Sequence, residues 1–238
     1  MGLLDVIGPV MIGPSSSHTA GACRLALLAR GLLSSPPRGA RLTLHGSFAK
    51  TARGHGTDLA LTAGLLGMHP EDERIPRAGE LAAQGGLAVT FDTADLGDVH
   101  PNTVRIELEG GDESASMTGS SLGAGFVKVF AVNGFEIDFS GNSHCLLVQH
   151  VDRPGVIASV ARVIADDEGN IARLHCARQR RGGEAMMSVE MDRRLSAHAL
   201  DYLAKLPYVR WLRMLPEVMS GAPVADDPVK DAPEAQDR

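Results

Sequence analysis

The run HCLLVQHVDRPGVIASVARVIADDEGNI, residues 144–171, decides the fold of the C-terminal part of the chain. Its first eight residues are largely apolar and predict a strand, and Asp152-Arg153-Pro154-Gly155 predicts a turn. A helix is expected next, because apolar residues recur there at helical spacing: Val156, Ile157, Val160, Val163 and Ile164. Gly169-Asn170 predicts the end of this helix.

The segments that follow continue the alternation of strand and helix. Strand patterns cover 171–178 and 185–191, and a second helix is predicted over 196–206 with Ser196 as its N-cap. Residues 208–215 predict a final strand. The order βαββαβ can close as a four-stranded antiparallel sheet with two helices on one face, which is a ferredoxin-like α+β fold.

This segment resembles the ACT domain, a small-molecule sensing module of amino-acid metabolism. The resemblance rests on the element order, the turn at 152–155 and Gly169-Asn170-Ile171, and it places the domain at 144–217. It implies self-association through the domain and a free amino acid bound at the strand-to-helix turn, where free N–H groups can receive a carboxylate. The implied effector-site candidates are Asp152, Gly155 and Asn170. The alternative is a turn that only joins a strand to a helix.

Charge and composition exclude several classes of protein. The chain has 23 Lys and Arg against 29 Asp and Glu, a net charge of −6, and 4% aromatic residues, so nucleic acid is not an expected partner. The longest apolar runs are a few residues, so no membrane span is expected. The N-terminal residues do not resemble a signal peptide, and a cytoplasmic location is expected. Residues 218–238 predict a disordered acidic tail rich in Ala and Pro.

Residues 1–143 are rich in glycine and predict a separate mixed α+β domain. Predicted helices cover 20–33, 57–66 and 77–84. Predicted strands cover 41–48, 87–92, 103–109, 126–132 and 136–140.

Three polar segments of this domain contain residues that could carry chemistry. They are Gly13-Pro14-Ser15-Ser16-Ser17-His18-Thr19, Gly54-His55-Gly56-Thr57-Asp58 and Val99-His100-Pro101-Asn102-Thr103. The first two lead into predicted helices, where hydroxyls and backbone N–H groups can bind an anion. An imidazole has an ordinary pKa of about 6.5, which suits proton transfer near neutral pH. Each segment alone also has a plainer explanation: a helix N-cap, a capped turn, and a loop with a surface imidazole.

A metal site in this chain is not expected. A zinc site is conceivable from four side chains: His18, His55, Asp58 and His100. It is not favoured, because no closely spaced histidine pair anchors it. The three cysteines match no zinc or ferredoxin spacing and are expected to be buried small hydrophobic residues: Cys23, Cys145 and Cys176.

At these residues, Met1 to Ser143 resembles the β chain of bacterial iron–sulfur L-serine dehydratase, also called L-serine ammonia-lyase. The matching stretches are VIGPVMIGPSSSHTAG at 6–21, Gly46-Ser47-Phe48-Ala49, residues 54–58 and 99–103, Asn133-Gly134-Phe135 and Ser140-Gly141-Asn142. Agreement repeated in this order is far more specific than one short motif. The domain is also similar in fold to the allosteric substrate-binding domain of some phosphoglycerate dehydrogenases.

The resemblance implies an enzyme that deaminates L-serine to pyruvate and ammonia. It implies a separate α chain whose cysteines hold a 4Fe–4S cluster with one iron open as a Lewis acid, so this chain would be active only with that partner. The implied catalytic residues are His55, His100 and Thr57, and either histidine could be the base that removes the α-proton. The implied substrate-binding residues are Ser15, Ser16, Ser17, His18 and Asn102.

The sequence leaves a different class of function open. A non-catalytic amino-acid sensor, made of an anion-binding domain and an ACT domain, would explain the glycine-rich turns. It would not explain why His55 and His100 both occupy turns bounded by glycine or proline. The chain also departs from the family at Ala124, where relatives usually have glycine, which puts a left-handed backbone at that position in doubt.

Overall fold

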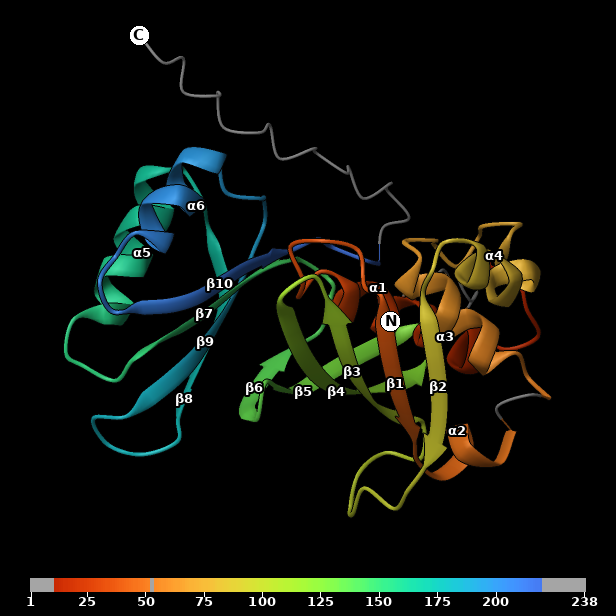
Figure 1. Cartoon of the computed structure of the whole chain (residues 1–238). Coiled ribbons are helices and arrows are strands. Elements are labelled where there is room, and N and C mark those ends of the chain that lie inside the picture. The colour runs from red at the N-terminus through yellow and green to blue at the C-terminus, as the bar shows by residue number, and fades with distance from the viewer. Residues whose placement is uncertain (1–10, 52–53, 220–238) are drawn as a thin grey trace, which may run out of the picture.

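The computed structural model describes residues 11–51 and 54–219, and these form two β-sheets with helices packed on each (Figure 1). The first sheet has six strands in the order β2-β1-β3-β4-β5-β6. Strands β1 and β2 are parallel, and every other neighbouring pair is antiparallel. The strands are β1 (Gly39–Leu44), β2 (Ala88–Thr93), β3 (Thr103–Gly110), β4 (Glu113–Gly123), β5 (Phe126–Val132) and β6 (Phe135–Phe139).

Helices cover one face of this sheet. They are η2 (Ser16–Gly21), a π-helical turn that runs directly into α1 (Ala22–Arg30), then α2 (Gly46–Thr51), α3 (Thr57–Leu65), the 3₁₀ turn η3 (Ile75–Arg77) and α4 (Ala78–Gln84). The core between helices and sheet is apolar and includes Leu25 of α1, Leu61 of α3 and Ile106 of β3, all 0% exposed. Helices α1 and α3 approach closely at Gly64, where an added Cβ would lie 2.2 Å from the carbonyl oxygen of Cys23.

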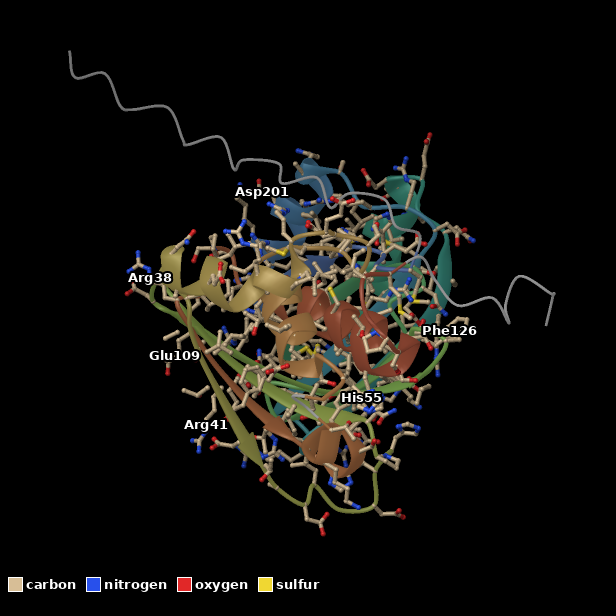
Figure 2. The ribbon with its side chains drawn as sticks, turned by 90° about the vertical axis from the view of Figure 1, so that its right-hand side faces the viewer. Arg38, Arg41, His55, Glu109, Phe126 and Asp201 are labelled. Atoms are coloured by element: carbon tan, nitrogen blue, oxygen red, sulfur yellow. The ribbon has the colours of Figure 1, made fainter. Side chains whose placement is uncertain are left out.

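The other face of the six-stranded sheet is polar. Arg41 faces Glu107 across β1 and β3, and Glu107 faces Ser116 across β3 and β4. These side chains line an open groove of about 770 Å³. Figure 2 shows Arg41 and Glu109 at this outer edge of the molecule. The alternation of apolar and polar residues along each strand therefore separates a helix-covered face from a solvent-facing one.

The second sheet has the order β10-β7-β9-β8, with every neighbouring pair antiparallel. Its elements are β7 (His144–Val151), α5 (Val156–Asp166), β8 (Ile171–Arg178), β9 (Glu184–Met191), α6 (Ala197–Ala204) and β10 (Val209–Leu215). A second core joins the helices to the sheet through Val160, Leu203 and Val189. The expected α+β class and the βαββαβ order are confirmed.

Strand β7 contributes side chains to both cores. Cys145 and Leu147 belong to the core under the first sheet, and Leu146 and Val148 belong to the core under α5 and α6. Successive side chains of a strand point to opposite faces, so one strand can serve both cores. The second sheet is therefore covered by its own helices on one face and packs against the N-terminal part of the chain on the other.

Polar contacts add to this junction. The carboxylate of Glu190, which is 5% exposed, accepts hydrogen bonds from the backbone N–H of Ser140 at 2.9 Å and from its hydroxyl at 2.8 Å. Arg213 of β10 donates to Glu113 of β4 at 2.6 Å. Hydrogen bonds to a charged group are stronger than neutral ones, so Glu190 ties the two sheets together where they meet.

The chain returns to the first core after β10. Val218 is 1% exposed, and its N–H donates to the carbonyl oxygen of Gly141 at 3.0 Å. The predicted tail, 218–238, therefore begins with a residue that packs in the core, and its remainder from 220 onward lies outside the described residues.

Three predictions of local structure for the first domain are wrong. The strand expected over 41–48 ends at Leu44, because the chain turns at Gly46 into α2. The first helix starts at Ser16, before the expected residue 20, and strand β4 lies where no strand was expected. Ala124 adopts a φ of +50°, so the chain keeps a left-handed backbone at this position without glycine.

Candidate functional site

The imidazole of His18 is held between two serine hydroxyls. Ser15 is the N-cap of η2, and its Oγ accepts the backbone N–H of His18 at 3.3 Å and lies 3.3 Å from His18 Nδ1. On the other side of the ring, Ser47 Oγ lies 3.2 Å from His18 Nε2. The ring also packs edge-on against Phe48, with centroids 5.5 Å apart. These contacts fix the position of the imidazole.

His55 lies beside His18. The two ring centroids are 5.1 Å apart, with 34° between the ring planes. Burial lowers the pKa of His18 below its usual range, and the nearby imidazole of His55 lowers it further. His55 itself is exposed, and Figure 2 shows it well away from Asp201 in α6. The pair therefore combines a partly buried imidazole that favours its neutral form with an exposed one.

The two imidazoles are carried by helix starts that lie side by side. His18 is in the first turn of the continuous helix formed by η2 and α1, and His55 comes two residues before α3. Gly56 has a φ of +70°, which allows the chain to turn into α3. Helix starts present free N–H groups and a positive dipole end, so this arrangement favours a bound anion. π-helical turns such as η2 also occur frequently at functional sites.

The segment 100–102 joins this cluster through the backbone. The N–H of Ser47 donates to the carbonyl oxygen of Pro101 at 2.8 Å, and Gly46, with a φ of +54°, packs directly on Pro101. The His100 side chain is exposed, and its Nδ1 accepts the N–H of Asn102 at 3.1 Å. Within the described residues, the ring of His100 makes no contact with the imidazoles of His18 and His55. The next residue, Pro101, is the one that accepts the N–H of Ser47.

Several buried polar atoms near these segments have no hydrogen-bond partner within the described part of the chain. They include Thr57 Oγ1, Asn102 Oδ1, Thr19 Oγ1 and Ser121 Oγ. Thr57 and Ser121 are both 0% exposed. An unpaired buried hydroxyl is costly, so each is a candidate to bind a ligand. Ser16 and Ser17 are half-buried, and an added Cβ on Gly123 would lie 3.8 Å from Ser17 Oγ.

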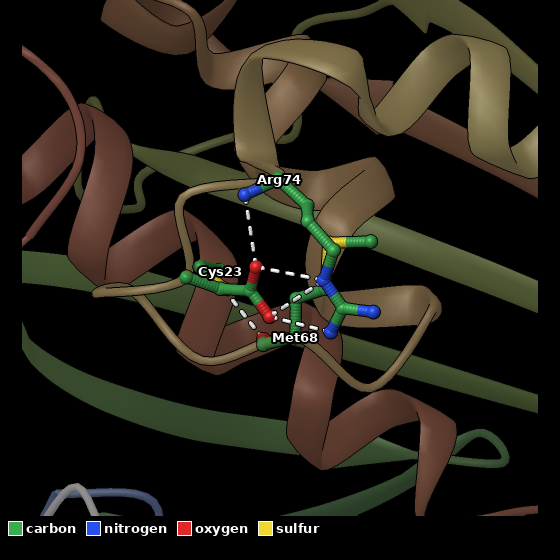
Figure 3. Close-up of polar contacts among 4 residues, drawn as sticks. Cys23, Met68 and Arg74 are labelled. Carbon is green, nitrogen blue, oxygen red and sulfur yellow. Dashed lines mark hydrogen bonds and ion pairs between the residues drawn. The ribbon is translucent and has the colours of Figure 1, made fainter.

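Two of the three cysteines are unsuited to metal ligation. Cys23 is 0% exposed, and its thiol donates to the carbonyl oxygen of Met68 at 3.1 Å, next to the loop where Arg74 binds Asp72 (Figure 3). Burial raises the pKa of both Cys23 and Cys145 well above the ordinary thiol value. Metal ligation requires the thiolate. The residues described here therefore do not fit a cluster-binding set, and no group of three metal-binding side chains lies among them.

The third cysteine differs from the expectation. Cys176 is exposed on β8, at the edge of the second sheet, with its sulfur 3.7 Å from His150 Nε2. The expectation of a buried cysteine is therefore wrong at this position, because β8 is the outermost strand of its sheet and most of its side chains are exposed.

The three effector-site candidates of the second domain occupy separate contacts. Asp152 accepts the N–H of Gly182 at 2.9 Å, which is the main cause of its lowered pKa. Gly155 has a φ of +88° and starts α5. Asn170 donates instead to Asp192 at 2.8 Å. Among the residues that the structure describes, these candidates make no hydrogen bond to one another.

Ser47 was not predicted as a site residue. Its stretch, Gly46-Ser47-Phe48-Ala49, carries part of the family resemblance, but the apolar alternation before it favours a strand. The signal that could have revealed it is the glycine followed by a hydroxyl residue after a strand, which is typical of a strand-to-helix turn.

Fold and site together define a two-part α+β protein with paired imidazoles at adjoining helix starts and a βαββαβ module. Residues 4–130 match the family described as serine dehydratase beta chain, and residues 146–210 match the AHAS small subunit-like ACT domain. The chain belongs to the serine dehydratase β-chain family. None of the helices in the described ranges is long and apolar enough to cross a membrane.

Individual relatives agree with this assignment. The chain is 43% identical to a probable L-serine dehydratase beta chain of Bacillus subtilis, over 87% of this chain and 94% of that protein. It is 41% identical to the L-serine dehydratase beta chain of Peptoniphilus asaccharolyticus, over 81% and 87% of the two chains. It is also 24% identical to D-3-phosphoglycerate dehydrogenase of Bacillus subtilis, over 82% of this chain and 37% of that protein.

Proposed function

We propose that this chain is the β subunit of an L-serine dehydratase that converts L-serine to pyruvate and ammonia together with an α chain carrying a 4Fe–4S cluster. The observation that carries the proposal is the His18–His55 pair at two adjoining helix starts, 5.1 Å between centroids. The names of the two beta-chain relatives support the subunit role. In this proposal the cluster belongs to the α chain, in keeping with the burial of Cys23 and Cys145.

The roles of this chain's residues follow from their surroundings. The substrate carboxylate binds at the helix starts, where the N–H groups near Ser16 and Ser17 favour an anion. We assign removal of the α-proton to either His55 or His100, because both imidazoles are exposed and their segments adjoin His18 and Ser47, respectively. Thr57, a buried hydroxyl with no partner in the described part of the chain, orients the substrate or a neighbouring group.

The net reaction balances without an added oxidant or reductant. L-Serine loses its α-proton and its β-hydroxyl to give aminoacrylate, which becomes iminopropionate. Water then hydrolyses the imine to pyruvate and ammonia.

We further propose that the second domain provides self-association and an effector site. Strand β8 lies at an edge of the second sheet, so it is available to pair with another copy of the chain. The turn at 152–155 leads into α5 through Gly155, which leaves the first N–H groups of the helix free for a carboxylate. Size measurement and amino-acid binding to the full chain test these two roles.

The test of the main proposal is reconstitution. The chain expressed alone is expected to be colourless and to make no pyruvate from L-serine. Mixed anaerobically with the α chain, it is expected to give a brown, iron- and sulfide-containing complex that releases pyruvate. Pyruvate formation by this chain alone would contradict the split enzyme. An absence of both complex and turnover, with amino-acid binding to the second domain, would favour the non-catalytic sensor.

A further inference from the structure

We propose that Ser47 presents the hydroxyl that contacts the substrate, and that His18 is a positioning residue that acts through it. The inference rests on the proposed function and deepens it. Both ring nitrogens of His18 are already occupied by serine hydroxyls, at 3.3 Å for Nδ1 and 3.2 Å for Nε2. An imidazole with both nitrogens engaged has no free atom to offer a carboxylate.

The hydrogen-bond directions around His18 follow from Ser15. Its Oγ already accepts the backbone N–H of His18 at 3.3 Å, so its own hydrogen is free to donate to His18 Nδ1. The start of the helix is a region of positive potential. It therefore favours an unprotonated Nδ1, whose lone pair accepts a hydrogen bond, over a protonated Nδ1. Burial lowers the pKa of His18, which favours the neutral ring, and in the neutral ring these contacts place the single proton on Nε2.

The direction at Ser47 is then set. His18 Nε2–H donates to Ser47 Oγ, and the hydrogen of Ser47 remains available for a further acceptor. Among the described residues, His18 is the only side chain that forms a hydrogen bond with this hydroxyl. The hydrogen bonds thus run in sequence from the backbone N–H of His18 to Ser15 Oγ, from Ser15 to His18 Nδ1, and from His18 Nε2 to Ser47 Oγ. Within the described residues, the Ser47 hydroxyl at the end of this sequence is a donor without an acceptor. A carboxylate or hydroxyl oxygen of a small hydroxy amino acid fits this donor.

The backbone of Ser47 is fixed for this task. Its N–H donates to Pro101 at 2.8 Å, and its carbonyl oxygen accepts the hydroxyl of Thr51 at 2.8 Å. Gly46 allows the close approach to Pro101, since an added Cβ would lie 2.7 Å from the Pro101 carbonyl oxygen. The hydroxyl is therefore held between the segment of His100 and the ring of His18, which lies beside His55.

The first arm of the test uses the full chain alone and does not depend on activity. Nitrogen-15 NMR of His18 is expected to show the neutral tautomer with its proton on Nε2. In Ser47→Ala this preference is expected to weaken, and in Ser47→Thr, which keeps the hydroxyl, it is expected to persist. Thr90→Ala is the matched control, because it removes a threonine hydroxyl that donates to the backbone carbonyl of Ala40 and plays no part in the contacts of His18 or Ser47. A proton on Nδ1 in the wild type, or no change in Ser47→Ala, would overturn the inference.

The second arm uses the enzyme reconstituted with the α chain. Ser47→Ala is expected to lower kcat/KM for L-serine by roughly ten- to a hundredfold, mainly through KM, since it removes a hydrogen bond to a charged or polar substrate atom. Ser47→Thr is expected to restore most of the loss, and Thr90→Ala is expected to behave as wild type. If the wild type is active and Ser47→Ala has unchanged kinetics, the substrate contact of Ser47 is refuted, whereas the proposed function is not. An inactive wild type would refute the proposed function, while the NMR arm still decides the hydrogen-bond directions.

Discussion

Replacing Gly46 by alanine should both destabilise the protein and disturb the site. Gly46 has a φ of +54°, and a side chain in this left-handed region costs roughly 1–2 kcal/mol. An added Cβ would also lie 2.7 Å from the carbonyl oxygen of Pro101 and 2.8 Å from its Cα. Both atoms are backbone and cannot rotate away, so overpacking adds about 1–3 kcal/mol. The expected loss of unfolding free energy in Gly46→Ala is about 2–5 kcal/mol.

Urea unfolding followed by circular dichroism measures this loss, and Gly86→Ala is the matched control. Gly86 has a φ of +74°, but an added Cβ there would meet nothing within 4 Å. The control should therefore lose only the roughly 1–2 kcal/mol of backbone strain. The difference between the two variants isolates the contact with Pro101. Equal losses in both would refute the close approach that joins the His100 segment to Ser47.

Four further predictions concern charge and the second domain. The pKa of His18, followed by NMR titration, should lie below the ordinary value of about 6.5 and should rise in His55→Gln, though not fully, because burial is the larger cause. Between the lowered pKa of folded His18 and its ordinary pKa in the unfolded chain, the unfolded state binds more protons, so the free energy of unfolding should increase as the pH rises through this window. His18→Asn should remove this pH dependence. An unchanged pH profile of stability in His18→Asn would argue against a lowered pKa for His18. Glu190→Gln should lower the unfolding free energy by about 1–3 kcal/mol, because two hydrogen bonds from Ser140 lose a charged acceptor; an effect near zero in urea unfolding would show that this junction contributes little. Gly155→Val, at a φ of +88°, should change any amino-acid response measured by calorimetry and leave turnover intact, and loss of basal turnover would show a structural role instead.

The fold of the second domain could be predicted because its signals are local. Apolar spacing over 156–164 and the glycine-containing turns at each end of this helix specify strand, helix and connection within a few residues. Strand β4 escaped prediction because its outward residues are serine and threonine and its inward residues include Ala115 and Gly119. Small side chains give weak alternation, and the neighbouring strands decide that the segment pairs.

The candidate site was only partly accessible from the sequence. Ser15 and His18 lie near a helix start that the serine run predicts, and His55 precedes another. The 5.1 Å approach of the two rings depends on how α1 and α3 pack, which no local pattern encodes. Ser47 reaches His18 only because the chain turns at Gly46, so its contact lies beyond local reasoning. The roles of His100 and Asn102 remain predictions.

The central claim is that the imidazoles of this chain perform proton transfer on L-serine. The most direct measurement is kcat for pyruvate release by the complex with the α chain, comparing wild type with His55→Ala and with His100→Ala. The variant that lacks the base is expected to lose roughly two to four orders of magnitude. Near-normal kcat in both variants, with the complex and its iron content intact, would contradict the account.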